Sequence, residues 1–169
     1  SVIFIITGSL LLSVIIILVT MVFFIRDFNR KRLSKTRLAD SELRLKNILN
    51  ALPVGVFIMS SDGQPYYANT KAKEILGRDI IPETKVDTLP EIYQAYRVGT
   101  KELYPVEEMP IAKALKGQVT LGVEDMELRK DNIVVPVRIN AIPLYNGEQS
   151  LEYAIGVFED ITKIKEAEN

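Results

Sequence analysis

The stretch that decides the fold is residues 133–162, IVVPVRINAIPLYNGEQSLEYAIGVFEDIT. Two apolar runs, over 133–142 and 151–158, flank a loop that contains Asn146 and Gly147. Asn-Gly between segments rich in β-branched residues indicates a hairpin, because a type I′ turn needs two residues that tolerate positive φ. Alternate positions share one strand face: Ile133, Val135, Val137, Ile139 and Ala141 in the first run, and Leu151, Tyr153, Ile155 and Val157 in the second. We therefore expect two long antiparallel strands, the second leading directly into a charged helical segment.

The N-terminal segment differs in composition from the rest of the chain. Residues 2–25, VIFIITGSLLLSVIIILVTMVFFI, contain no charged residue. A helix needs roughly 20 apolar residues to cross a bilayer, so this run can span a membrane with some tilt. Six Lys or Arg residues follow over 26–37 with one Asp among them. By the positive-inside rule, the sequence predicts a transmembrane helix over 1–25 in an inner or plasma membrane, with the following domain in the cytoplasm.

A basic linker and an amphipathic helix are expected over 26–52. Spacings of three and four residues, typical of a coiled-coil seam, separate Leu38, Ser41, Leu45, Ile48 and Leu52. The pattern is short and includes a serine, so two interpretations stay open. The stripe either pairs with a second copy in a homodimer or packs on the domain of its own chain. Pro53 ends the helix.

The chain contains no Cys and no His. Absence of Cys excludes disulfides and a covalently attached flavin, and absence of His excludes a His-ligated haem. No glycine-rich phosphate loop and no EF-hand spacing occurs. Residues 51–169 carry thirteen Lys or Arg against nineteen Asp or Glu, which disfavours nucleic acid as a partner. We expect no catalytic residue and no metal site here; the cofactor is unknown, and a non-covalent small ligand or flavin stays open.

One α+β domain is expected over 53–162, with five strands in an antiparallel sheet and flanking helices. Local signals mark its start: Asp62-Gly63 predicts a hairpin turn, Asn69 the N-cap and Gly77 the end of a helix over 70–76, and Pro110 the start of another helix. Residues 78–108 are expected to form only short helical turns and loops. The remaining three strands follow the second helix.

Two features of these later strands depart from regular pairing. The alternation slips near Glu124 and Asp125, which predicts a bulge; as neighbours that point apart, these carboxylates are expected to be solvated. Pro136 lies inside a strand but lacks an N–H, so regular pairing is expected only after it.

Three segments resemble the PAS superfamily of sensory domains: LPVGVFIMSSDGQPYYANTKAKEILG at 52–77, MPIAKALKGQ at 109–118 and AIGVFEDIT at 154–162. The resemblance covers residues 42–162. It implies a sensing or dimerising module, usually joined to a histidine kinase, a diguanylate cyclase or a chemotaxis-type output. It also implies a signal-transmission site at Asp160, Ile161 and Thr162, which would tie the last strand to the outgoing helix over 163–169. Ordinary helix capping without a switching role is the alternative.

These observations lead to one functional expectation. The chain is expected to be a membrane-anchored PAS fragment of a sensor protein, which passes a conformational signal to an output domain absent from the chain. A histidine kinase of a two-component system is the expected output. Tyr67, Tyr93 and Tyr96 are candidates to line a ligand cavity, with core packing as the alternative. A purely structural dimerisation module that binds nothing is the alternative function.

Overall fold

The structure is a computed structural model that describes residues 20, 21, 23, 24, 26, 37–131 and 133–168. The transmembrane helix expected over 1–25 and most of the basic linker lie outside these residues. Among the described residues, no helix has both the length and the apolar composition needed to cross a membrane. The chain divides into two compact units, Ser1–Lys46 and Asn47–Asn169, and the second contains the whole sheet.

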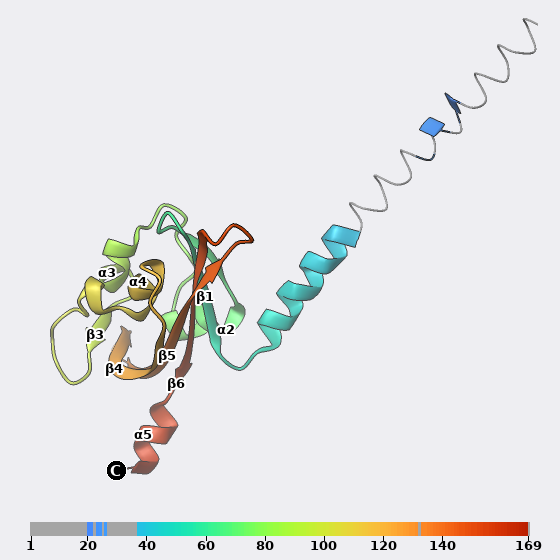
Figure 1. The fold of residues 1–169 in the computed structure, drawn as a ribbon. Coiled ribbons are helices and arrows are strands. Elements are labelled where there is room, and N and C mark those ends of the chain that lie inside the picture. The colour runs from blue at the N-terminus through green and yellow to red at the C-terminus, as the bar shows by residue number, and fades with distance from the viewer. Residues whose placement is uncertain (1–19, 22, 25, 27–36, 132, 169) are drawn as a thin grey trace, which may run out of the picture. The chain divides into compact units, whose positions relative to one another are not determined.

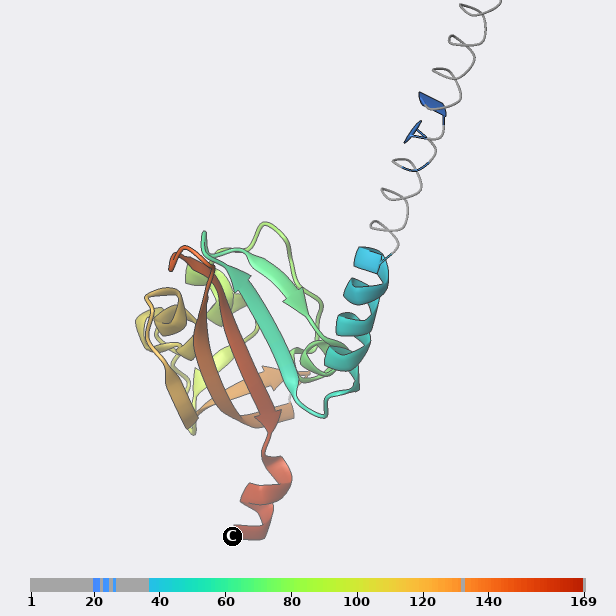
Figure 2. The ribbon, with the colours of Figure 1, turned by 45° about the vertical axis from the view of Figure 1, so that its right-hand side comes forward.

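The second unit is built on one antiparallel sheet of six strands in the order β2-β1-β6-β5-β4-β3 (Figure 1, Figure 2). The strands are β1 (Gly55–Ser60), β2 (Pro65–Ala68), β3 (Ala95–Arg97), β4 (Thr120–Lys130), β5 (Ile133–Tyr145) and β6 (Leu151–Asp160). The first and last strands in sequence, β1 and β6, pair as the second and third strands of this order. The α+β architecture is thus confirmed, and the N-terminal and C-terminal hairpins meet where β1 pairs with β6.

The sheet has six strands, so the expectation of five is wrong. The additional strand, β3, pairs with β4 from Ala95↔Leu128 to Arg97↔Met126. It lies in the region over 78–108 that was expected to hold only turns and short helices. Three residues are too few for alternation to reveal a strand. The strand β3 is therefore defined by its pairing with the edge of β4 and not by a pattern in its own sequence.

Helices gather between the second strand and the fourth. They are α2 (Thr70–Leu76), α3 (Leu89–Ile92) and α4 (Pro110–Leu115), with the 3-10 turns η1 (Val86–Thr88) and η2 (Val106–Glu108); α5 (Thr162–Glu168) follows β6. Three local predictions are confirmed: Asn69 caps α2, Gly77 ends it with φ of 76°, and α4 begins at Pro110. In Figure 1, α3 and α4 lie on the same side of the sheet.

The core lies between these helices and one face of the sheet. Val137, Ile139 and Ala141 of β5 are buried on this face, as the alternation predicts. The buried residues of β6 are Ala154, Gly156 and Phe158, so the face shared by Leu151, Tyr153, Ile155 and Val157 is the opposite, half-buried one. The register of the long β5–β6 hairpin thus sends small and aromatic residues of β6 into the core.

The β5–β6 hairpin is confirmed, but its turn is not the two-residue type. The Asn146 N–H donates to the Ser150 carbonyl at 2.9 Å, closing a longer loop. The Asn146 side-chain oxygen accepts from the N–H groups of Glu148 and Ser150. Positive φ falls on Gln149, at 61°, and not on Gly147. The asparagine side chain therefore holds this turn.

Pro136 interrupts only one of the two ladders of β5. Pairing with β6 begins at Val137, as expected, whereas pairing with β4 continues through Pro136 to Ile133. The Pro136 carbonyl accepts from the Ile161 N–H at 3.0 Å, just beyond the end of β6. Because the N and O of a strand residue point to the same side, the missing N–H faces the place where β6 stops. The bulge expected in β4 is confirmed by a register shift between Val123 and Met126.

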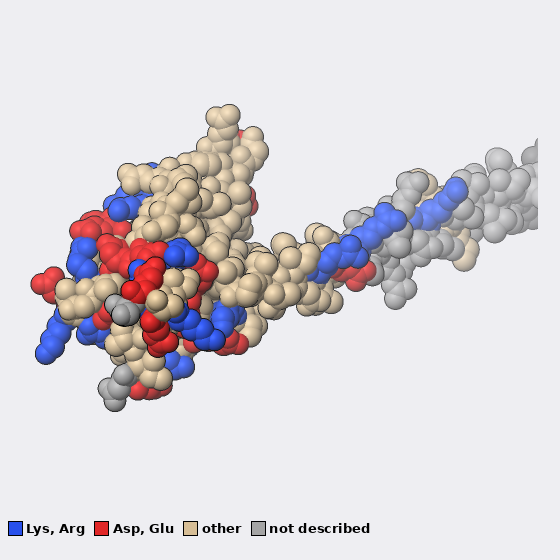
Figure 3. All heavy atoms as spheres, turned by 90° about the horizontal axis from the view of Figure 1, so that it is seen from below, with Lys and Arg blue, Asp and Glu red and all other residues tan. Residues whose placement is uncertain are grey.

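The helix over 37–51 exposes both basic and apolar side chains. Figure 3 shows Lys and Arg side chains along it; Arg37, Arg44 and Lys46 supply this charge in the sequence. Leu38, Leu43, Leu45 and Ile48 are each more than half exposed. The helix ends before Pro53, as expected.

Candidate functional site

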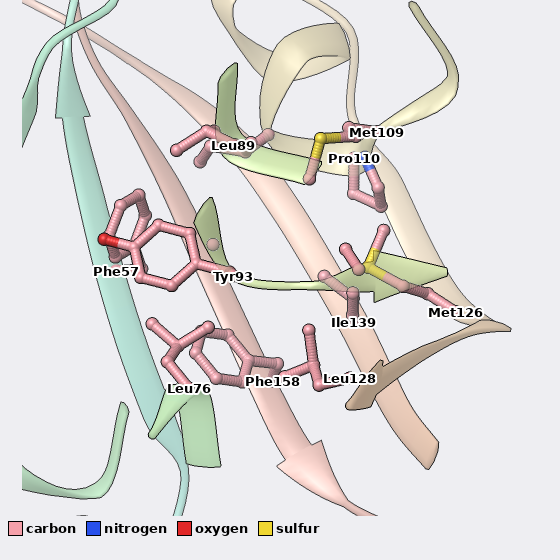
Figure 4. A pocket seen from close by; sticks show the side chains of 13 residues that line it. Phe57, Leu76, Leu89, Tyr93, Met109, Pro110, Met126, Leu128, Ile139 and Phe158 are labelled. Atoms are coloured by element: carbon pink, nitrogen blue, oxygen red, sulfur yellow. The ribbon is translucent and has the colours of Figure 1, made fainter. Parts of the chain in front are cut away.

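A cavity of about 70 Å³ lies between the sheet and the helices (Figure 4). Its walls come from strands β1, β3, β4, β5 and β6 on one side, and from helices α2, α3 and α4 with the segments beside them on the other. All 13 lining residues are apolar or aromatic. Besides the thioethers of Met109 and Met126, the only side-chain heteroatom among them is the hydroxyl of Tyr93. The cavity can therefore hold apolar surface but offers no charge.

The structure brings only one of the three candidate tyrosines to this cavity. Tyr93 lines it, whereas Tyr67 and Tyr96 do not. The Tyr67 hydroxyl donates to the side-chain oxygen of Asn50 at 3.4 Å. The Tyr96 ring lies under the guanidinium of Arg129, 4.1 Å from ring centroid to carbon. Both tyrosines thus pack at the edges of the domain.

Sequence reasoning missed most of the cavity wall. Phe57 and Phe158 lie on the core faces of β1 and β6, and strand alternation could have indicated both. Met109 precedes the helix start at Pro110, and Met126 follows the β4 bulge, where alternation no longer tells which face a residue takes. Which residues around the bulge line the cavity could be found only from the pairing register of β4.

The hydroxyl of Tyr93 is buried without a hydrogen-bond partner among the described residues, and the whole side chain is 6% exposed. The ring packs edge-on against Phe57, with centroids 5.8 Å apart at 78°. Burial raises the pKa of Tyr93 above its usual value. A buried hydroxyl without a partner costs the folded state about 1–3 kcal/mol. Tyr93 therefore stabilises the core through its ring alone.

Asp160, Ile161 and Thr162 form the joint between β6 and α5. A side-chain oxygen of Asp160 accepts from the Thr162 N–H at 2.8 Å and from the Thr162 hydroxyl at 2.5 Å. Ile161 is fully buried, and its N–H donates to the Pro136 carbonyl at 3.0 Å. The helix begins at Thr162, and the Asp160 carboxylate satisfies an N–H of its first turn. The joint is fixed by a buried side chain on one side and a capped helix start on the other.

A chain of ion pairs also ties α5 to the sheet. The Lys165 ammonium lies 2.8 Å from one oxygen of Glu124, and the Arg138 guanidinium lies 2.7 Å from the other. Arg138 also pairs with Glu159 at 2.8 Å. The hydrogen bond from Lys165, followed by that from Arg138, lowers the pKa of Glu124, and Glu124 raises the pKa of both cations. Glu124 is thus not simply solvated, as had been expected, because the β4 bulge turns it toward these partners.

Asn69 forms the corresponding joint at the start of the domain. It is fully buried, and its side-chain oxygen accepts from the N–H groups of Val56 and Ala72 at 2.9 and 2.8 Å. Its amide nitrogen donates to the carbonyls of Leu49 and Val54 at 2.7 and 3.0 Å. Only the bond to Ala72, the helix cap, was predicted. The other three connect the end of the helix over 37–51 to β1, and no local pattern signals them.

A metal site in a chain without Cys or His would need several acidic side chains close together. Among the described residues, no group of three or more Asp or Glu side chains is arranged to hold a metal ion.

Comparison with known proteins identifies the family. A family model described as PAS domain matches residues 53–163. The crystal structure of the PAS domain of an HTR-like protein from Haloarcula marismortui is similar over 77% of this chain and 99% of that one, with 14% identity and a TM-score of 0.51. An RNA-binding light-oxygen-voltage receptor is similar over 77% of this chain and 36% of that one, with 17% identity and a TM-score of 0.55. The PAS domain of nitrogen regulation protein NR(II) from Vibrio parahaemolyticus is similar over 69% of this chain and 96% of that one, with 16% identity and a TM-score of 0.48. A search of curated protein sequences gave no match.

The hydrogen bonds of Asn69 predict that replacement of Asn69 by Asp costs more stability than the same replacement of Asn50. Asn69→Asp keeps the acceptor oxygen but places a second oxygen against the carbonyls of Leu49 and Val54. We expect it to lower the free energy of unfolding by about 2–4 kcal/mol, because two part-buried carbonyls lose their donor and face a second buried oxygen. The control is Asn50→Asp, since Asn50 acts only as an acceptor, toward Thr70 and Tyr67. Denaturant unfolding of the full chain measures both, and equal losses would contradict the assignment.

The unpartnered hydroxyl of Tyr93 predicts that its removal does no harm. We expect Tyr93→Phe to leave the free energy of unfolding unchanged or to raise it by about 1 kcal/mol, because a desolvated hydroxyl is lost and no hydrogen bond is broken. Tyr104→Phe is the matched control: its hydroxyl donates to Asp125 at 2.8 Å, so its loss should cost about 1 kcal/mol. Thermal and denaturant unfolding of the two variants compare them. A clear loss of stability in Tyr93→Phe would show that the hydroxyl has a partner.

Proposed function

The chain belongs to the PAS domain family, and from that premise we propose that it is the membrane-anchored sensor and relay module of a signal-transduction protein. In this proposal, residues 1–25 anchor the chain in an inner or plasma membrane and the PAS domain lies in the cytoplasm. A conformational signal leaves through α5 toward an output domain beyond Asn169, with a histidine kinase as the favoured output. The proposal assigns no catalytic step to this chain itself.

The observation that carries the proposal is the double attachment of α5. The Asp160 cap attaches it to β6, and the ion pair between Lys165 and Glu124 attaches it to β4. β4 also carries Met126 and Leu128, whose side chains line the cavity. A change in the cavity that displaces β4 relative to β6 would alter the position of Glu124 against the start of α5.

Such a relay needs two arrangements whose populations the input can bias. The ion pairs around Glu124 are half-exposed and can exchange partners at low cost. The buried Ile161 and the Asp160 cap stay with the sheet, so they supply a pivot. We infer that α5 turns about this pivot while the contact of Lys165 with Glu124 is made or broken.

The membrane anchor is supported by composition. Residues 2–25 contain no charge, and Lys or Arg dominate the residues that follow. Basic side chains near an anionic membrane surface favour the cytoplasmic side.

A second candidate function, a dimerisation module that binds no ligand, is favoured by the helix over 37–51. Its exposed Leu38, Leu45 and Ile48 follow the spacing of a coiled-coil seam. Pairing with a second copy would remove this apolar stripe from water. Both candidate functions include a homodimer. They differ in whether the cavity binds a ligand.

The relay predicts that Glu124 restrains α5. We expect Glu124→Gln to speed hydrogen exchange of the amides of α5 by about two- to five-fold, because the contact with Lys165 loses its charge. Glu148→Gln removes the same charge in the β5–β6 loop and serves as control. Exchange is followed by mass spectrometry on the full chain. Equal exchange of α5 in wild type and Glu124→Gln would rule out a restraint through β4.

The seam predicts position-dependent cross-linking. Since the chain has no Cys, single cysteines can be introduced at Ile48, which lies on the stripe, and at Leu43, which is equally exposed but lies off it. We expect Ile48→Cys to form a disulfide between two copies in isolated membranes and Leu43→Cys to give no such cross-link. Equal cross-linking at the two positions would contradict the seam. Absence of the chain from the membrane fraction would contradict the anchor.

A further inference from the structure

The cavity has a chemical character that narrows what can fill it. None of its 13 lining residues is charged or carries an amide side chain. Transfer of an unpaired charge or an unpartnered polar group into such surroundings is strongly unfavourable. A phosphate, a carboxylate or the polar edge of a flavin would find a single side-chain donor here, the Tyr93 hydroxyl, and no positive charge.

The size of the cavity sets a second limit. An apolar cavity of about 150 Å³ stays dry and takes up benzene or xenon. The cavity of this domain, at about 70 Å³, is roughly half as large. Empty apolar space forfeits dispersion contacts, so a compact occupant regains them without displacing ordered water.

Two methionines make the wall adaptable. Met109 lies at the start of α4 and Met126 on β4, so they approach the cavity from the helical layer and from the sheet (Figure 4). Unbranched thioether side chains change rotamer readily and refill irregular space. The wall can therefore expand moderately around an occupant while Phe57 and Phe158 stay in place.

From these observations we propose that the cavity binds a compact, uncharged, apolar molecule, from the size of a xenon atom to that of a small hydrocarbon ring. The biological role of such a ligand rests on the proposed sensory function, because occupancy of the cavity would be the input signal that β4 passes to α5. The chemical class of the ligand follows from the residues that line the cavity alone. The same wall excludes nucleotide cofactors and charged metabolites as ligands of this cavity.

The chain contains its own reporters for a direct test. Of its four methionines, Met109 and Met126 line the cavity, whereas Met59 is buried on β1 outside the lining. Methionine methyl groups labelled with carbon-13 are followed by NMR on the full chain as xenon pressure is raised. We expect the signals of Met109 and Met126 to shift with saturation and that of Met59 to stay. Parallel, non-saturating shifts of all three, or no shift, would overturn the proposal, as would saturable shifts of the same two signals with flavin mononucleotide.

Two variants that change the cavity volume in opposite directions provide a second test. The test then does not depend on the correct folding of a single variant. A Cβ at Gly156 would lie 3.4 Å from the terminal carbon of Ile111, so Gly156→Ala narrows the cavity with one tight contact. We expect it to weaken xenon binding by about four-fold, the equivalent of one methylene group. Ile139→Val enlarges the cavity and should make benzene binding tighter. Unchanged binding in both variants would locate the ligand elsewhere.

The outcomes separate this inference from the relay. Saturable methyl shifts together with no effect of Glu124→Gln on exchange in α5 would keep the ligand and reject the relay through β4. An effect of Glu124→Gln without saturable shifts would keep the relay and reject this ligand class.

Discussion

The four hydrogen bonds of the Asn69 side chain hold together the parts on which the rest of the domain depends. They fix the end of the incoming helix, the first residues of β1 and the first turn of α2 in one buried cluster. Because the amide is fully buried, no water can replace a lost partner. β1 in turn pairs with β6 along its whole length. One strand pair therefore links this buried cluster to the strand that precedes α5.

The strand β4 separates two environments of opposite character. On one face, Met126 and Leu128 border an apolar cavity. At its bulge, Glu124 joins Lys165 and Arg138 in a charged chain. Dispersion contacts respond to shape, and half-exposed ion pairs rearrange at little cost. A bulge is a natural place to couple them, because local pairing there is already interrupted.

The features that could be predicted from the sequence are those made by local chemistry. The caps at Asn69 and Gly77, the helix start at Pro110 and the β4 bulge all arise from residues that act within a few positions of themselves. The PAS resemblance likewise rests on short motifs, and the family is confirmed. The strand β3, the pairing of Glu124 with Lys165 and the cavity wall arise between segments far apart in sequence, where register decides which side chains meet. Tyr67 and Tyr96 illustrate the limit, since aromatic character predicted burial but not which space each ring would fill.

The pairing of β1 with β6 also bears on how such a domain is assembled into larger proteins. Gly55, at the start of β1, lies opposite Phe158, near the end of β6. A Cβ at Gly55 would come within 2.6 Å of that ring, so a bare backbone is needed where the chain begins the sheet. The chain consequently starts and finishes its sheet at neighbouring points. A domain with adjacent ends can be inserted into, or excised from, a longer polypeptide without pulling its flanking segments apart, which makes this fold suited to gain and loss as an interchangeable cassette.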